Sequence, residues 1–213
     1  MIVYMLRFWD RANAVTLGSL LLSCASALFA LRQSSALAMI ALIGAGVCDL
    51  VDGLVARRLK RTQQQKLFGQ RLDSLVDSCA FGMSPMVICF GLGLTTLLDC
   101  FLLAFFVCCV VWRLAFFETV GMEQEGEQRY YIGLPTTYVA LVIPLVFLTA
   151  LIDHELMRVL LRVAILGLAG AMVSSLRFPK PGKTGYAFLF GLAVVVVSIL
   201  GLQMSRFQSA MQP

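Results

Sequence analysis

Residues 36–92 read ALAMIALIGAGVCDLVDGLVARRLKRTQQQKLFGQRLDSLVDSCAFGMSPMVICFGL. Two apolar runs flank a short basic loop in this stretch, and each run is long enough to cross a bilayer as a helix of about 20 residues. Asp49 and Asp52 end the first run, and Asp73 and Asp77 begin the second. A carboxylate near a bilayer is costly unless it is paired, bound to a metal or facing water. The stretch therefore predicts a membrane hairpin of two helices with a functional site at its polar end.

The rest of the chain continues this pattern. Of its 213 residues, 60% are hydrophobic and 14% are charged, and the mean hydropathy is +0.88. This composition indicates an all-α integral membrane protein, and no stretch is left for a soluble domain. We expect a single domain, residues 1–213, with about seven (six to eight) transmembrane helices. The expected spans are 15–31, 36–56, 72–92, 95–117, 135–151, 157–176 and 185–204.

The chain start differs from these spans. Residues 1–14 mix Arg7, Asp10 and Arg11 with apolar side chains and lack the cleavage pattern of a signal peptide. We therefore expect an N-terminal amphipathic helix that lies in the membrane interface. The seven cysteines show no metal-ligand spacing and lie almost wholly inside apolar runs, so we expect small buried hydrophobic residues.

Basic residues predict the orientation. With the N-terminus inside the cell, only Arg32, Arg158, Arg162 and Arg206 fall outside, and the loop between the second and third spans is cytoplasmic. The four aspartates then face the cytosol. The basic side chains of this loop remain open to a second interpretation, as topology determinants that also grip anionic headgroups. They are Arg58, Lys60, Arg61 and Lys66.

Helix geometry indicates which acids can meet. Asp49 and Asp52 are three residues apart and Asp73 and Asp77 are four apart, so each pair shares a helix face. Four carboxylates at close quarters repel one another unless divalent cations lie between them. All-oxygen ligation of this kind suits Mg²⁺ or Mn²⁺, which often bind substrate phosphates as well.

The residues after Asp52 favour a phosphate-bearing substrate. Gly53 leaves the backbone open to close approach, Ala56 keeps the same face small, and Arg57 offers a cationic fork for phosphate. Together with the acids, they predict phosphoryl chemistry on a lipid-linked substrate. A cation transporter is the main alternative from another class, but the acids lie near one membrane face and no inverted repeat is evident.

The motif Asp49-x-x-Asp52-Gly53-x-x-Ala56-Arg57, followed by Gly69-x-x-x-Asp73-x-x-x-Asp77, resembles the signature of the CDP-alcohol phosphatidyltransferases. One departure is the spacer 58–68, which is longer than the family's usual spacer. We expect its extra residues in a polar loop, because flexible loops lengthen at little cost.

Within this family, the chain most resembles the membrane-embedded type that forms phosphatidylserine. The matching motifs are Phe68-Gly69-x-x-Leu72-Asp73-Ser74-Leu75-x-Asp77, Phe81-Gly82-x-x-Pro85, Trp112-Arg113-Leu114-Ala115 and Gly133-Leu134-Pro135. Phe116 stands where that type commonly has a second arginine after Arg113.

The resemblance implies a role for each matching residue. Asp49, Asp52 and Asp73 would ligate Mg²⁺ or Mn²⁺, and Asp77 would be a ligand or the general base. The residues that would line the pocket for the CDP moiety are Asn13, Thr16, Gly53, Ala56, Arg57 and Gly69. Arg113 would bind the serine carboxylate or a phosphate. Two alternatives stay open: Asn13 and Thr16 as caps of the first helix, and Arg113 as a side chain snorkelling to headgroups.

The implied reaction transfers the phosphatidyl group from CDP-diacylglycerol to L-serine, which gives phosphatidylserine and CMP. The same chemistry with inositol phosphate, glycerol phosphate or choline is the alternative. No clear extra basic cluster is present for a phosphorylated acceptor, which favours serine. The resemblance further implies a homodimer among membrane lipids, in a bacterial or archaeal cytoplasmic membrane, with no nucleic-acid partner.

Overall fold

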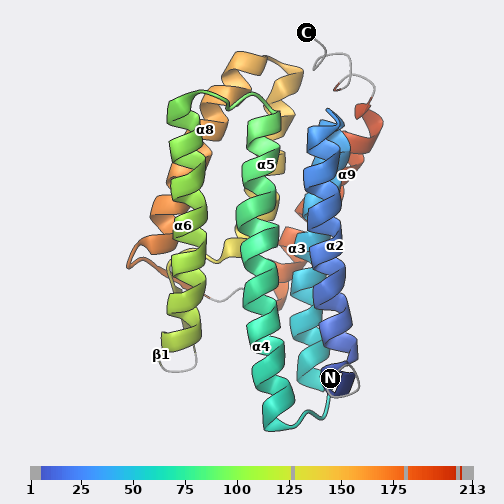
Figure 1. Ribbon diagram of the computed structural model, residues 1–213, viewed down its shortest axis with the longest axis vertical. Coiled ribbons are helices and arrows are strands. Elements are labelled where there is room, and N and C mark those ends of the chain that lie inside the picture. The colour runs from blue at the N-terminus through green and yellow to red at the C-terminus, as the bar shows by residue number, and fades with distance from the viewer. Residues whose placement is uncertain (1–5, 126–127, 180–181, 205–206, 208–213) are drawn as a thin grey trace.

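The computed structural model describes residues 6–125, 128–179, 182–204 and 207, and these form a bundle of helices (Figure 1). Within the described residues, six helical segments are long and apolar enough to cross a membrane. They are Arg11–Leu31, Ser35–Arg58, Gln63–Gly91, Leu97–Val120, His154–Val173 and Thr184–Leu202. A seventh apolar helix, Thr136–Leu151, is shorter. The prediction of an all-α integral membrane bundle with six to eight spans is thus confirmed.

The elements follow one another with short connections. In chain order they are η1 (Leu6–Phe8), α2 (Arg11–Leu31), α3 (Ser35–Arg58), α4 (Gln63–Asp77), η2 (Ser78–Met83), α5 (Ser84–Gly91), α6 (Leu97–Val120), β1 (Glu123–Glu125), β2 (Gln128–Ile132), η3 (Thr136–Tyr138), α7 (Val139–Phe147), η4 (Leu148–Leu151), α8 (His154–Val173), β3 (Arg177–Pro179) and α9 (Lys183–Leu202). The loop between α3 and α4 lies at the same end of the bundle as the N-terminal turn and β1 (Figure 1).

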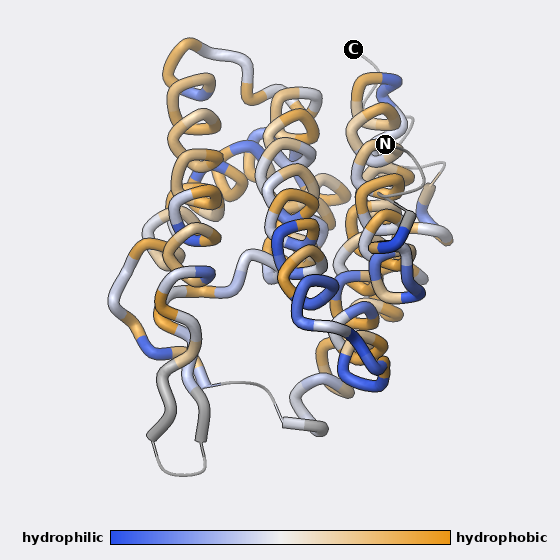
Figure 2. Tube along the Cα trace, turned by 60° about the horizontal axis from the view of Figure 1, so that its bottom comes forward, coloured by the Kyte–Doolittle hydropathy of each residue, from blue (hydrophilic) through white to orange (hydrophobic). Residues whose placement is uncertain are grey.

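Small polar side chains hold α2 against α3. Ser19 donates a hydrogen bond to the Ala45 carbonyl over 2.9 Å, and Ser26 donates to the Ala38 carbonyl over 2.6 Å. Small residues of this kind let membrane helices approach each other closely. Close packing and hydrogen bonds are important there because lipid tails are as apolar as leucine, so the hydrophobic effect contributes little to helix association. Large apolar side chains instead cover the outside of the bundle, whereas hydrophilic residues gather near the helix ends (Figure 2). This distribution suits a bilayer.

Three local expectations need correction. The described part of the expected interfacial helix is only the turn η1, because α2 already begins at Arg11; residues 1–5 lie outside the described residues. The expected loop 58–68 is also shorter, because a Thr62–Gln65 capping box starts α4 at Gln63, well before its apolar run. Among the cysteines, all free, only Cys89 and Cys109 are buried, and most of the others face outward.

The helix that carries Asp73 and Asp77 changes its winding directly after the second acid. Residues Ser78–Met83 form a π-helical segment that joins α4 to α5. Pro85 lies just beyond it, and its missing N–H removes one donor from the regular hydrogen-bond ladder. Single π turns inside α-helices occur frequently at functional sites.

A further buried acid, Asp99, lies in the first turn of α6, away from the other four. Its side chain is 2% exposed and accepts two hydrogen bonds from Arg162 of α8, over 2.7 and 3.0 Å. The Thr96 hydroxyl adds a third contact at 2.8 Å. A buried carboxylate with these partners needs no ligand, so we exclude Asp99 from the site.

A small antiparallel sheet, which the sequence did not lead us to expect, follows α6. Its strand order is β1-β2-β3, with Tyr131 opposite Phe178. The turn after β2 is tied to the end of α8 by hydrogen bonds from the Gly133 amide to the Leu176 carbonyl and from the Leu134 amide to the Ala171 carbonyl. This turn places η3 and α7 beside α3.

Gly133 is a sensitive point of this turn. It has φ +73°, and a Cβ there would collide with the Met172 carbonyl oxygen. Gly121 has a similar φ of +75°, but a Cβ there would meet nothing within 4 Å. Gly121 has ψ −150°, and this combination of φ and ψ is essentially restricted to glycine, so we expect Gly121→Ala to cost the backbone strain alone, about 1–3 kcal/mol. Gly133→Ala adds a collision with the Met172 carbonyl oxygen to its own backbone strain, so it should cost more.

Thermal unfolding of the two variants in detergent tests this difference. We expect the midpoint to fall further for Gly133→Ala than for Gly121→Ala. Equal shifts would mean that the Met172 carbonyl oxygen does not exclude a side chain at position 133.

Candidate active site

Four carboxylates meet between α3 and α4. Asp49 and Asp52 come from the C-terminal half of α3, and Asp73 and Asp77 come from α4. Asp49, Asp52 and Asp73 each offer an oxygen, and these oxygens lie within 4.8 Å of one another. The Asp77 carboxyl group lies close enough to that of Asp49 for the two to interact. The two predicted pairs therefore form one cluster.

Hydroxyl groups from two other helical segments orient this cluster. Thr16 of α2 donates a hydrogen bond to Asp52 Oδ2 over 2.5 Å, and Asp52 is only 6% exposed. Thr137 of η3 donates to Asp49 Oδ2 over 2.9 Å. The remaining carboxylate oxygens can still reach a ligand.

The cluster has the chemistry of a site for a hard divalent cation. Its donors are all carboxylate oxygens, which suit Mg²⁺ and Mn²⁺. Three acids within 4.8 Å also repel one another strongly, and a cation between them would relieve this repulsion. The donors present thus fit such an ion.

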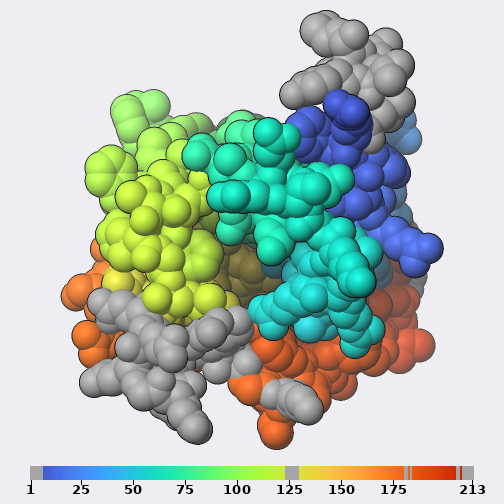
Figure 3. Space-filling view, turned by 90° about the horizontal axis from the view of Figure 1, so that it is seen from below, coloured from blue at the N-terminus to red at the C-terminus, as the bar shows by residue number. Residues whose placement is uncertain are grey.

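A cavity of about 670 Å³ adjoins the acids. Its polar end holds the four aspartates together with Arg57 and Arg113. Its other walls are mostly apolar and come from α3, α7 and α9. Two of these wall residues, Leu54 and Phe190, are 53% and 55% exposed, so the cavity reaches the outer surface of the bundle. Figure 3 shows the loop end of the protein, where the surface is hollowed between α4 and α6.

Arg113 is the buried cation of this cavity. Its residue exposure is 6%, and its guanidinium lies 4.9 Å from the centre of the Phe117 ring. It lies close enough to Asp77 and Asp49 to interact with their charges. Its Nε is buried and makes no hydrogen bond to the described residues. The side chain therefore points inward, which excludes snorkelling to the headgroups.

Three tyrosines, which the sequence gave no reason to select, line the same cavity. Tyr131 comes from β2, Tyr138 from η3 and Tyr186 from α9. Burial raises the pKa of Tyr131, so its hydroxyl stays protonated and can donate a hydrogen bond. The cavity thus carries hydroxyl donors beside Arg113.

The residues expected to hold CDP fall into two groups. Gly53 and Arg57 line the cavity, and a Cβ on Gly53 would meet nothing within 4 Å. Asn13 and Gly69 face each other elsewhere, because a Cβ on Gly69 would lie 3.2 Å from Asn13 Oδ1. Thr16 lies between the groups, at Asp52, and Ala56 does not line the cavity.

The cap of the first transmembrane helix is a different residue from those considered. Asp10 caps α2, and its Oδ1 accepts a hydrogen bond from the Asn13 amide over 2.9 Å. Capping therefore does not account for the side chains of Asn13 and Thr16.

Comparison with known proteins agrees with this geometry. A family described as CDP-alcohol phosphatidyltransferase matches residues 9–175. The chain is 39% identical over 109 residues to CDP-diacylglycerol–serine O-phosphatidyltransferase of Saccharomyces cerevisiae, covering 48% of this chain and 38% of that protein. It is 31% identical over 155 residues to the protein of the same name from Methanocaldococcus jannaschii, covering 72% and 70%.

A third relative carries a related name. Archaetidylserine synthase of Methanothermobacter thermautotrophicus is 27% identical over 161 residues, which cover 75% of this chain and 65% of that protein. The chain spans only about two fifths of the length of the yeast relative. The family match takes in α2 to α8, including all four aspartates and Arg113. The chain therefore belongs to the CDP-alcohol phosphatidyltransferase family.

Proposed function

We propose that this protein transfers the phosphatidyl group of CDP-diacylglycerol to L-serine in a metal-dependent reaction, releasing CMP. The observation that carries the proposal is a cluster of four carboxylates at the polar end of a cavity with mostly apolar walls. A lipid with a charged head needs both environments at once. The names of the relatives support serine as the acceptor.

The donor would lie with its acyl chains against the apolar walls. Leu54 and Phe190 bring these walls to the outer surface, so the chains can extend from the cavity towards the bilayer. The nucleotide would occupy the region of Asn13, Thr16, Gly53, Ala56, Arg57 and Gly69.

Asp49, Asp52 and Asp73 would hold Mg²⁺ or Mn²⁺, which would neutralise the negative charge of the donor's pyrophosphate. Thr16 and Thr137 fix the orientation of two of these acids. Asp77 would act as the general base and accept the proton of the serine hydroxyl. The serine oxygen then bonds to the phosphorus that bears diacylglycerol, and the bond from this phosphorus to the oxygen of CMP breaks.

Arg113 would bind the serine carboxylate. It is buried, its Nε lacks a partner among the described residues, and it lies beside Asp77. An arginine suits this task because its planar fork matches a carboxylate. Tyr131 and Tyr186, which also line the cavity, would add hydrogen bonds.

The membrane setting completes the proposal. The distribution of lysine and arginine supports a cytosolic position for the acid cluster. By resemblance to the membrane-embedded type, we propose a bacterial or archaeal cytoplasmic membrane. By resemblance to the family, we propose a homodimer.

An acceptor screen tests the serine assignment. Purified protein with Mn²⁺ receives CDP-diacylglycerol and one labelled alcohol: serine, inositol phosphate, glycerol phosphate or choline. We expect labelled lipid with serine alone. Metal-dependent product with another alcohol and none with serine would refute the acceptor while keeping the reaction class.

A further inference from the structure

Arg61 lies in the short loop between α3 and α4, within the spacer that exceeds the family's usual length. Its side chain is 8% exposed, whereas its neighbours Arg58 and Lys60 are exposed residues. A topology determinant or a headgroup contact would point outward, as these neighbours do. Arg61 instead turns into the protein, which corrects the interpretation of this loop for that residue.

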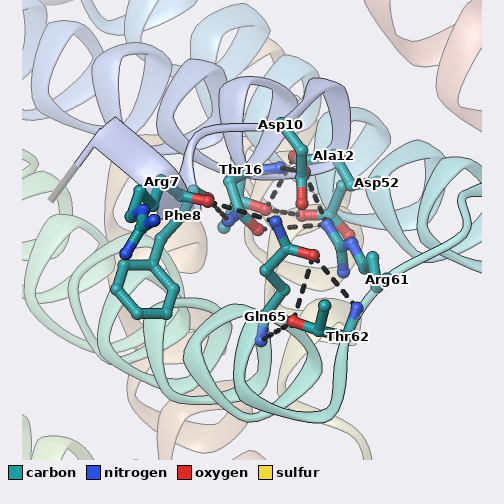
Figure 4. Close-up of polar contacts among 10 residues, drawn as sticks. Arg7, Phe8, Asp10, Ala12, Thr16, Asp52, Arg61, Thr62 and Gln65 are labelled. Atoms are coloured by element: carbon teal, nitrogen blue, oxygen red, sulfur yellow. Dashed lines mark hydrogen bonds and ion pairs between the residues drawn. The ribbon is translucent and has the colours of Figure 1, made fainter. Parts of the chain in front are cut away.

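Two residues at the start of α2 hold the guanidinium. Arg61 Nη2 lies 2.6 Å from Asp10 Oδ1 (Figure 4). The same Nη2 lies 3.2 Å from Asn13 Oδ1. Asn13 is itself oriented, because its Nδ2 donates to the Phe8 carbonyl over 2.7 Å. Burial alone would raise the pKa of Asp10, but hydrogen bonds from Arg61 and the Asn13 amide together hold this pKa below its usual value. The contact at neutral pH is therefore an ion pair.

This ion pair is incompletely satisfied. Arg61 Nε and Asp10 Oδ2 are both buried, and neither has a hydrogen-bond partner in the part of the chain that the structure describes. Buried donors of a charged group normally find partners, because leaving one unpaired is costly. A guanidinium with an unpaired buried donor is therefore suited to receive an anionic ligand.

The position of Arg61 indicates which ligand. Its Nη1 lies 3.1 Å from where a Cβ on Gly69 would stand, so it covers a glycine of the family motif. Its charge also acts on Asp52, as that of Arg113 acts on Asp49 and Asp77. Two buried arginines thus border the acid cluster, one beside Asn13 and Gly69 and the other in the cavity.

We propose that Arg61 binds the donor phosphate next to the cytidine, the one that stays on CMP, with Asp10 as the residue that positions Arg61; this inference rests on the proposed function. The unpaired Nε and the adjacent Nη1 supply hydrogen-bond donors for phosphate oxygens. The longer spacer thereby provides a phosphate contact in addition to Arg57. Arg61 takes no part in bond making or breaking.

Binding of CMP and of cytidine to the full chain in detergent, with Mg²⁺ present, tests this role. The two ligands differ only by the phosphate. We expect Arg61→Ala to weaken CMP binding roughly 10- to 100-fold and to leave cytidine binding within about twofold. Arg61→Lys should lie between, since it keeps the charge but loses the fork. Lys60→Ala removes an exposed charge from the same loop and should change neither affinity.

A second variant distinguishes loss of the phosphate contact from misfolding. Asp10→Asn keeps a good helix cap but removes the charge that orients Arg61, so CMP binding should weaken less than in Arg61→Ala. Equal losses for CMP and cytidine, no loss, or tighter CMP binding in Arg61→Ala would each overturn the inference. Failure of the unmodified protein to bind CMP at all would instead count against the proposed function.

Discussion

We expect Asp77→Asn to lower the turnover number for phosphatidyl transfer by about 10²–10⁴-fold, the usual contribution of a general base. Asparagine has nearly the same shape as aspartate and can hydrogen-bond to Asp49, but it cannot accept the serine proton. The KM for CDP-diacylglycerol should change little, because binding of the donor does not require this proton transfer.

Ser78→Ala is the matched control for this substitution. Ser78 is the next residue in the chain, is partly exposed, and donates only to the Leu75 carbonyl over 2.7 Å. Its loss should leave turnover within about twofold of the unmodified protein. If Asp77→Asn retains near-full turnover with an unchanged melting temperature, Asp77 is not the base.

We expect removal of divalent cations with EDTA to abolish transfer, and addition of Mg²⁺ or Mn²⁺ to restore it. The reason is electrostatic: without a cation, the pyrophosphate of the donor would face three carboxylates whose oxygens already lie within 4.8 Å of one another. Full activity in the presence of EDTA would contradict a metal-dependent reaction.

Mn²⁺ binding, followed by electron paramagnetic resonance, tests the ligands independently of activity. Asp52→Asn and Asp73→Asn should each weaken Mn²⁺ binding at least about tenfold. Asp153→Asn is the control, because Asp153 is an exposed helix cap at the start of α8 and asparagine caps equally well. A loss of the same size in this control would place the ion elsewhere.

Much of the fold and the acid cluster could be predicted from sequence because both depend on local patterns. Apolar runs define the membrane helices, and spacings of three and four residues place Asp49 with Asp52 and Asp73 with Asp77 on shared faces. The two helices are joined by a short connection, so their acids meet with little further information.

The parts that could not be predicted depend on contacts between distant segments. Thr137 reaches Asp49 from 88 positions away, and only the turn at Gly133 brings it there. Hydropathy treats Arg58, Lys60 and Arg61 alike, although Asp10 draws only Arg61 inward among these three. The apolar run also does not predict the start of α4, because the first turns of this helix precede the run and are stabilised by the Thr62 cap instead.

The most direct test of the central claim follows both products of one reaction. Purified protein is mixed with CDP-diacylglycerol, Mn²⁺ and labelled serine, and CMP and labelled phosphatidylserine are measured together over time. We expect both to appear in equal amounts, with neither formed when Mn²⁺ is omitted or when Asp77→Asn replaces the unmodified protein. CMP without labelled lipid, or no CMP at all with the folded and metal-loaded protein, would contradict transfer to serine at the four aspartates.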